Sequence, residues 1–387
     1  MNRSRRIFRL ASLTLLASGL LASPGAAAPL SPARTPRIQV AILLDTSSSM
    51  DGLIDQARNQ LWQVVDTFGK ARQGNLAPTL EVAVLEYGNS GLSAQSGFVH
   101  QVSGLTTDLD RVSEALFALT TNGGDEYCGY AIDVATRELQ WSSAKEDIRA
   151  IFIAGNEPFD QGPVSYVGSI ALAKQRGIVV NTIHAGPYAE GLATHWQTGA
   201  QLAGGRFMSI DANQQIVHVA APQDAEIAAL NARLNETYVP YGAEGGAARK
   251  RQIAQDANSE SISGALLSKR AEAKASALYE SSTWDLVDAV EKDKLALDRV
   301  KPEDLPEKLR AMREPELATF VESKSKARKE IQGKIRALGA ERASFVAEEQ
   351  RKAATPELKS LDTALTEAVV EQGRSKGFTF EPTAPKP

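Results

Sequence analysis

Hydrophobic runs alternate with amphipathic segments through the first half of the chain. Short apolar runs, typical of buried strands, occur at residues 38–44, 80–87, 98–102, 149–154, 178–184 and 206–210. Between them, apolar positions recur at helical spacing at residues 51–72, 108–119, 130–141, 164–176 and 192–202. Strands that alternate with helices are typical of a mostly parallel sheet covered on both faces. The pattern therefore predicts a doubly wound α/β domain over residues 37–221.

The pattern becomes helical after residue 221, and no strand-like run follows before residues 378–380. We expect a helix at 225–234, a turn-rich connector at 238–248 and an apolar stripe around 284–290. A long helix with a narrow apolar seam is expected from 317 to 346. A last helix should begin at Thr355–Pro356 and end at Gly373. Because a narrow seam covers only one or two neighbours, residues 222–387 are predicted to form a helical hairpin or small bundle.

Charge also separates the two halves of the chain. Residues 37–221 contain 19 acidic and 11 basic residues, whereas residues 222–387 contain 28 and 27. The whole chain has a formal net charge of −4, so it has no broad basic field for nucleic acid. Its one cysteine, Cys128, excludes an internal disulfide.

The N-terminus has the order of a cleavable signal peptide. Four arginines precede an apolar stretch at residues 10–21, and small residues follow at 22–28. The apolar stretch is too short for a stable membrane anchor, and no later segment is long and apolar enough to be one. We therefore expect a signal peptide at 1–28, a proline-containing linker at 29–36, and export of the chain without a transmembrane anchor after cleavage.

The most informative motif directly follows the first predicted strand. It reads Asp45-Thr46-Ser47-Ser48-Ser49, at the end of a strand where ligands of open α/β sheets bind. A hard divalent cation prefers oxygen ligands, and one carboxylate with two hydroxyls from a tight turn supplies part of such a set. Asp45, Ser47 and Ser49 are therefore candidate metal ligands. The alternative is a serine-rich turn that caps the helix beginning near Asp51.

Asp45, Ser47 and Ser49 match the D-x-S-x-S pattern of the metal-ion-dependent adhesion site (MIDAS), and residues 37–221 resemble the von Willebrand factor type A (VWA) family. The resemblance implies Mg²⁺, or Mn²⁺ or Ca²⁺, as the bound cation. It also implies a protein or peptide partner that offers a carboxylate to the metal. The strings GGDEYCG and AGNEPF look like those of exported bacterial VWA proteins of unassigned role.

The second and third loops depart from the family pattern. The second loop of the family normally supplies a threonine to the metal. Glu126 has that spacing here, and Asp125 and Thr121 are alternative candidate ligands. The alternative to metal binding by this loop is a solvated acidic turn. The third loop of the family usually contains an aspartate, which is missing here, so Asn156 or Glu157 would have to replace it. A carboxylate at Glu126 would neutralise more of the metal charge and weaken its attraction for an external carboxylate.

No common enzyme motif is present in the sequence. We therefore expect a non-enzymatic, metal-dependent protein- or peptide-binding module in the periplasm, or secreted. One alternative is a structural protein whose VWA-like domain has lost its metal and whose helices mediate assembly. Another is a metal-assisted hydrolase that uses Glu126 as a general base.

Overall fold

The computed structural model describes residues 34–211, 218–292, 294–353 and 361–380, and the described residues from Thr35 onward belong to one compact unit. The expected signal peptide, most of the linker and the Thr355–Pro356 helix start lie outside the described residues. No described helix has both the length and the hydrophobicity needed to cross a membrane.

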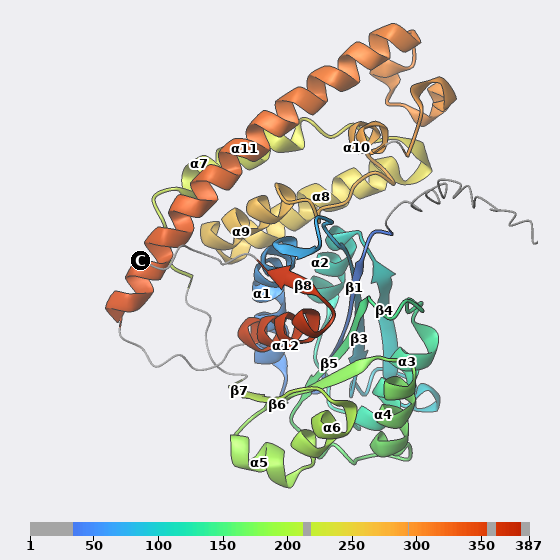
Figure 1. Cartoon of the computed structure of the whole chain (residues 1–387), viewed down its shortest axis with the longest axis vertical. Helices are drawn as coiled ribbons and strands as arrows, with labels where there is room; N and C mark the ends of the chain where they lie inside the picture. The colour runs from blue at the N-terminus through green and yellow to red at the C-terminus, as the bar shows by residue number, and fades with distance from the viewer. Residues whose placement is uncertain (1–33, 212–217, 293, 354–360, 381–387) are drawn as a thin grey trace, which may run out of the picture. The chain divides into compact units, whose positions relative to one another are not determined.

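The described residues form a six-stranded sheet in the order β4-β3-β1-β5-β6-β7 (Figure 1). Its strands are β1 (Arg37–Asp45), β3 (Thr79–Tyr87), β4 (Val99–Thr106), β5 (Ile148–Gly155), β6 (Val179–Ala185) and β7 (Phe207–Ile210). All neighbours pair in parallel except β3 and β4. The chain builds outward from β1 in one direction and then in the other, so the strand order reverses between β1 and β5. This confirms the predicted mostly parallel α/β fold, and in open sheets of this kind ligands generally bind where the strand order reverses, here at the carboxyl ends of β1 and β5.

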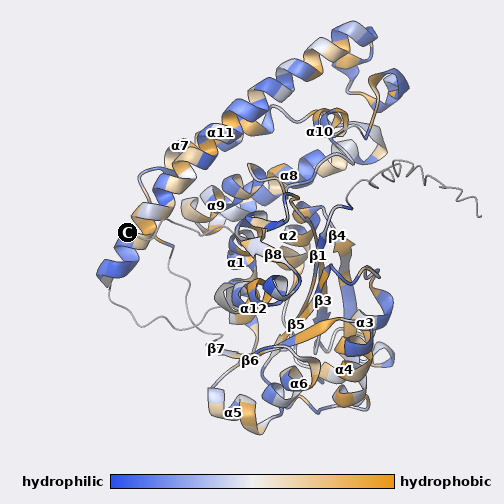
Figure 2. Ribbon diagram, viewed as in Figure 1, coloured by the Kyte–Doolittle hydropathy of each residue, from blue (hydrophilic) through white to orange (hydrophobic). Residues whose placement is uncertain are grey.

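Helices cover both faces of the sheet. They are α1 (Asp51–Gly69), α2 (Leu109–Ala118), α3 (Cys128–Glu138), α4 (Tyr166–Gln175), α5 (Tyr188–Ala193) and α6 (Trp196–Ala203). Alternate residues of β1 enter two cores, with Val40 and Ile42 facing α1 and Ala41 and Leu43 facing α3. The strands β3 and β5 are accordingly largely hydrophobic (Figure 2).

Two of the predicted helices have different limits in the structure. The helix predicted at 51–72 ends at Gly69, because residues 71–73 form the short strand β2 (Ala71–Gln73). The helix predicted at 192–202 is two helices, because His195 has a left-handed backbone with a φ of 69° and separates α5 from α6. Neither feature has a signature in the hydrophobic pattern.

The second half is helical, as predicted. It contains α7 (Asp224–Asn235), α8 (Gly242–Ile262), α9 (Gly264–Lys274), α10 (Leu286–Glu291) and the 40-residue α11 (Glu314–Ala353). The predicted connector at 238–248 is wrong, because α8 already begins at Gly242. Gly245 is buried in this helix, where an added Cβ would lie 3.1 Å from the carbonyl carbon of Pro240. That glycine serves close packing instead of a turn.

The C-terminal segment returns to the α/β domain. It consists of α12 (Leu361–Ser375) and β8 (Phe378–Phe380), which pairs with β2. Leu365 and Val369 are buried in the same core as α1 and β5. The last helix therefore runs two residues past its predicted end at Gly373. The helices α7 to α11 lie, in sequence, between the last strand of the α/β sheet and the helix that completes its core.

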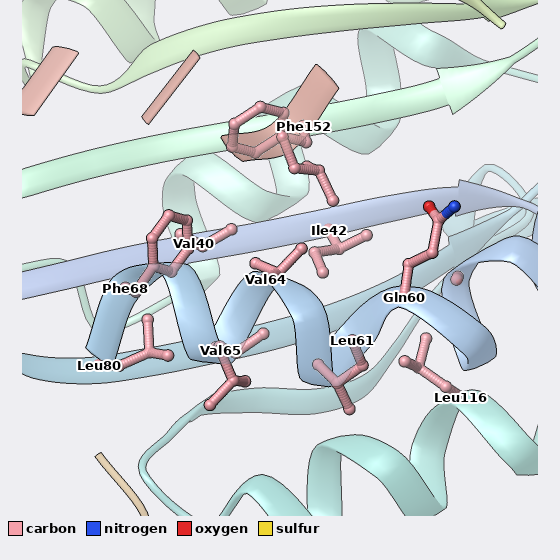
Figure 3. A pocket seen from close by; sticks show the side chains of 13 residues that line it. Val40, Ile42, Gln60, Leu61, Val64, Val65, Phe68, Leu80, Leu116 and Phe152 are labelled. Carbon is pink, nitrogen blue, oxygen red and sulfur yellow. The ribbon is translucent and has the colours of Figure 1, made fainter. Parts of the chain in front are cut away.

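A small apolar space of about 20 Å³ lies between α1 and the sheet (Figure 3). Val64 and Phe68 of α1 face Val40 of β1 and Phe152 of β5 across it. A space of this size holds about one water molecule. It is therefore a packing defect and not a ligand site.

Candidate metal site

The first loop places one buried carboxyl group and two hydroxyl groups together. Asp45 is the last residue of β1 and is fully buried. The backbone N–H of Ser47 donates to Asp45 Oδ1 at 2.8 Å, which turns the chain sharply after the strand. The hydroxyl oxygens of Ser47 and Ser49 are 3.3 Å apart. Asp45, Ser47 and Ser49, predicted from the motif, are thus brought together, with Ser49 exposed at the surface.

Glu126 reaches Asp45 from the second loop because glycines leave space for it. A Cβ added to Gly88 would lie 2.7 Å from Glu126 Cγ and 2.9 Å from Asp45 Oδ1. A Cβ added to Gly124 would lie only 2.4 Å from the carbonyl oxygen of Gly88. Since neither contact tolerates a side chain, these glycines let the second loop pack on the end of β3. Glu126 is 5% exposed as a result.

The two carboxyl groups of this site lack donors for their buried oxygens. Asp45 Oδ2 and Glu126 Oε2 are both buried and have no N–H or hydroxyl donor, and the two carboxyl groups lie within hydrogen-bonding reach of each other. Burial raises the pKa of Asp45 and Glu126 above the ordinary range, and the proximity of the two groups raises the pKa of Glu126 further. The charge of Glu157 also disfavours ionisation of both groups. A cation between them would remove this repulsion and satisfy the free oxygens.

Asn156 adds a neutral oxygen from the third loop. Its Nδ2 donates to Ser49 Oγ at 3.2 Å, and its Oδ1 has no hydrogen-bond partner. The donors near Asp45 are therefore carboxylate, hydroxyl and amide oxygens, which suit Mg²⁺, Mn²⁺ or Ca²⁺ better than a soft metal. No cluster of three or more His, Cys, Asp or Glu side chains suited to a metal occurs in the described part of the chain.

The other candidate ligands lie on the rim of the site. The Thr121 hydroxyl donates to Asp51 Oδ1 at 2.5 Å and is thereby turned toward the start of α1. Asp125 is exposed, and its proximity adds to burial in raising the pKa of Tyr127. Glu157 is also exposed. In this geometry Asn156 is better placed than Glu157 to replace the missing third-loop aspartate.

Tyr87 supports the site and was not anticipated from the sequence. Tyr87 donates from its hydroxyl to the carbonyl oxygen of Ala154 at 3.0 Å, which ties the ends of β3 and β5 together beneath Asp45. The thiol of Cys128 donates to Tyr87 Oη at 3.7 Å. Burial raises the pKa of Cys128 well above its usual range, so the thiol stays neutral and packs as a small side chain.

Gln161 links the second and third loops. Its Oε1 accepts a hydrogen bond of 2.9 Å from the backbone N–H of Glu126. A Cβ added to the neighbouring Gly162 would lie 2.5 Å from the ring of Tyr127. Gly162 has a φ of +94°, a conformation that favours glycine. The only sequence signal for this contact is the glycine itself, since a pairing between loops cannot be read from spacing.

Comparison of the sequence with family models and with curated proteins finds no match. Several solved structures are similar to part of the chain. Proximal thread matrix protein 1 from the mussel byssus, with a zinc-occupied MIDAS motif, is 16% identical, with 45% of this chain and 42% of that chain covered and a TM-score of 0.34. BatB from Bacteroides thetaiotaomicron is 17% identical, with 45% and 90% covered and a TM-score of 0.34.

The VWA domain of SpRpn10 is 18% identical to this chain, with 46% of this chain and 90% of that chain covered and a TM-score of 0.32. The present chain thus spans less than half the length of the mussel protein. The likeness concerns only part of the chain, so the case for a metal site depends on the geometry around Asp45 and Glu126.

Proposed function

We propose that this protein is a metal-dependent binding module whose α/β domain holds a divalent cation at the carboxyl edge of its sheet. One observation carries the proposal. Asp45 and Glu126 bring two buried carboxyl groups together, and each has an oxygen without an N–H or hydroxyl donor. Two unpaired buried carboxylates are costly to keep ionised, and a divalent cation offsets both charges.

Asp45, Ser47, Ser49 and Glu126 would hold the cation, with Asn156 completing the set from the third loop. Mg²⁺ is the expected ion, with Mn²⁺ or Ca²⁺ as alternatives, because all these donors are oxygens. Ser49 and Asn156 lie at the surface side of the site, so a donor from another molecule would arrive there. The cation would supply electrostatic attraction for that donor.

The partner in this proposal is a protein or peptide that offers a carboxylate oxygen to the cation. The helix α1 begins at Asp51, directly after the first loop, and its free amide groups favour an anionic donor at this edge. We place the module in the periplasm, or outside the cell, on the signal-peptide pattern of residues 1–28. Recognition, without catalysis, is the activity we assign to it.

Affinity capture tests this function. The immobilised protein, loaded with Mg²⁺, should retain envelope proteins that elute with EDTA. Asp45→Ala and Ser47→Ala should not retain them, because each variant removes a ligand from the buried set. Retention of the same proteins by Asp45→Ala, or after chelation, would contradict metal-dependent binding and favour the assembly role of the helical region.

A further inference from the structure

The third loop, which follows β5 and begins with Asn156, is anchored by the start of α6. Trp196, the first residue of α6, is fully buried, and its indole Nε1–H donates to the carbonyl oxygen of Glu157 at 2.9 Å. The backbone N–H of Phe159 donates to the carbonyl oxygen of Thr194, also at 2.9 Å. These hydrogen bonds fix the backbone of the residues that come directly after Asn156.

Aromatic packing reinforces this anchor. The side chain of Phe159 is fully buried, and its ring centre lies 4.9 Å from that of Trp196. A Cβ added to Gly199 of α6 would lie 2.5 Å from Cε1 of Phe159, so a side chain at this position would push against the ring. The carbonyl oxygen of Trp196 accepts from the Thr182 hydroxyl of β6 at 2.7 Å. The third loop is thus connected to the sheet through a buried tryptophan.

The backbone between α5 and α6 has an unusual conformation at this contact. His195 has a φ of 69°, which is uncommon for a residue with a side chain. Such a conformation costs free energy, and it persists where the surrounding structure determines it. Here it lies between Thr194 and Trp196, the two residues that hold the third loop. The backbone strain therefore supports a fixed position for this anchor.

Asn156 is consequently held from two sides. Its Nδ2 donates to Ser49 Oγ, and its backbone continues directly into the anchored Glu157. A ligand that is already ordered loses little freedom when an ion binds, so its affinity is higher. Mg²⁺ requires nearly ideal octahedral geometry with short contacts, whereas Ca²⁺ accepts longer contacts and a more flexible arrangement. A rigid third loop therefore favours Mg²⁺.

We propose that Trp196 is a positioning residue of the metal site, whose indole N–H fixes the third loop so that Asn156 favours Mg²⁺ over Ca²⁺. This rests on the proposed function, and it specifies how the ion of that site is selected. Trp196 acts through the backbone carbonyl of Glu157 and does not itself contact the ion. The carboxylate of Glu157 has no part in this role.

Calorimetric titrations of the full-length protein with Mg²⁺ and with Ca²⁺ test this role. Trp196→Phe keeps a ring against Phe159 but loses the N–H, so it should weaken Mg²⁺ binding about threefold to tenfold and Ca²⁺ binding by less. Trp62→Phe is the matched control. Trp62 is also fully buried, and within the described residues its Nε1 has no hydrogen-bond partner. This control should bind both ions as the wild type does, whatever its stability.

A second pair of variants leaves Trp196 in place. Gly199→Ala displaces Phe159 from α6 and should also weaken Mg²⁺ binding more than Ca²⁺ binding. Its control is Gly168→Ala in α4, where an added Cβ would meet no described atom within 4 Å. Both substitutions replace a glycine inside a helix, so their effects on helix propensity are matched.

The outcomes separate this role from the metal site itself. A wild type that binds neither ion would overturn the metal site and this role with it. If the wild type binds Mg²⁺ but Trp196→Phe and Gly199→Ala bind as their controls do, the positioning role is overturned and the metal site stands. Equal weakening of Mg²⁺ and Ca²⁺ would also overturn the role, because a general loss of structure would then be responsible.

Discussion

Single glycines decide whether the two carboxyl groups of the candidate site can meet. Gly88 has a φ of +78°, and its missing side chain leaves the space through which Glu126 approaches Asp45. The motif after β1 predicted Asp45, Ser47 and Ser49 because all three belong to one turn. The position of Glu126 depends on contacts between loops far apart in sequence, so spacing alone left Thr121 and Asp125 as alternative candidate ligands.

Gly88→Ala should therefore weaken Mg²⁺ binding strongly, because the new Cβ would collide with Glu126 and Asp45. Gly74→Ala is the matched control. Gly74 also has a positive φ, of +58°, but an added Cβ would meet nothing within 4 Å. Both variants should lose about 1 kcal/mol of stability from the left-handed backbone. Only Gly88→Ala should change the metal titration, and an equal effect of both would contradict this role of Gly88.

At the scale of elements, the α/β core is completed by a helix distant in sequence from the sheet. The strands and long helices followed from hydrophobic periodicity, which is why β1 and α11 lie where they were expected. The start of α8 was missed because its glycines were taken as turn residues, although Gly245 serves close packing. That α12 covers α1 and β5 could not be predicted, since an apolar stripe does not identify its partner.

Leu365→Ala should destabilise the α/β domain by about 2–5 kcal/mol, because Leu365 is 3% exposed in the core shared with α1 and β5. Chemical denaturation followed by tryptophan fluorescence measures this change. Arg374→Ala, at an exposed position of the same helix, should change stability by less than about 0.5 kcal/mol. Similar unfolding of both variants would show that α12 does not contribute to the core.

The packing of α9 against α11 predicts a pH-dependent change in stability. Burial raises the pKa of Glu272 to about 7, and its Oε1 has no hydrogen-bond partner. A carboxyl whose pKa is raised in the folded state stabilises the fold below its unfolded pKa, and this contribution is lost as the pH rises toward 7. Glu272→Gln should therefore be more stable than the wild type at pH 8, by about 2 kcal/mol, with the difference declining toward pH 5.

Thermal unfolding at several pH values measures this effect of Glu272. The control is Glu341→Gln, which changes an exposed carboxyl on α11 and should show no such dependence. Changes in other carboxyl groups cancel, because they are common to both proteins. A constant difference between Glu272→Gln and the wild type from pH 5 to pH 8 would contradict the raised pKa.

Across the whole molecule, a buried ionic network joins the α/β domain to the helices that follow it. Asp256 of α8 accepts from Arg270 at 2.6 Å and from Lys274 at 3.0 Å. Arg270 also pairs with Asp110 of α2 at 2.8 Å and lies 4.6 Å from the ring centre of Trp62 on α1. The predicted boundary at residue 221 thus stays a prediction, and buried contacts cross it.

Asp256→Ala should destabilise the protein by about 3–5 kcal/mol, because it leaves the buried Lys274 without a carboxylate and Arg270 with Asp110 alone. Glu260→Ala changes an exposed residue of the same helix and should be nearly neutral. Thermal unfolding of both variants checks the expectation. The pKa of Asp256 is lowered, in part by Lys274 and Arg270, so its stabilising effect should be lost as the pH falls below the ordinary carboxyl range. A nearly neutral Asp256→Ala would contradict this account of the network.

The central claim is that Asp45 and Glu126 share a divalent cation, and a calorimetric titration of the protein with Mg²⁺ tests it most directly. We expect saturable binding at a single site and a melting temperature that rises with Mg²⁺, since a ligand that binds only the folded state stabilises it. Asp45→Asn and Glu126→Gln should each abolish both effects, whereas Glu322→Gln should keep them. Absence of heat and an unchanged melting temperature across millimolar Mg²⁺, Mn²⁺ and Ca²⁺ would contradict the claim.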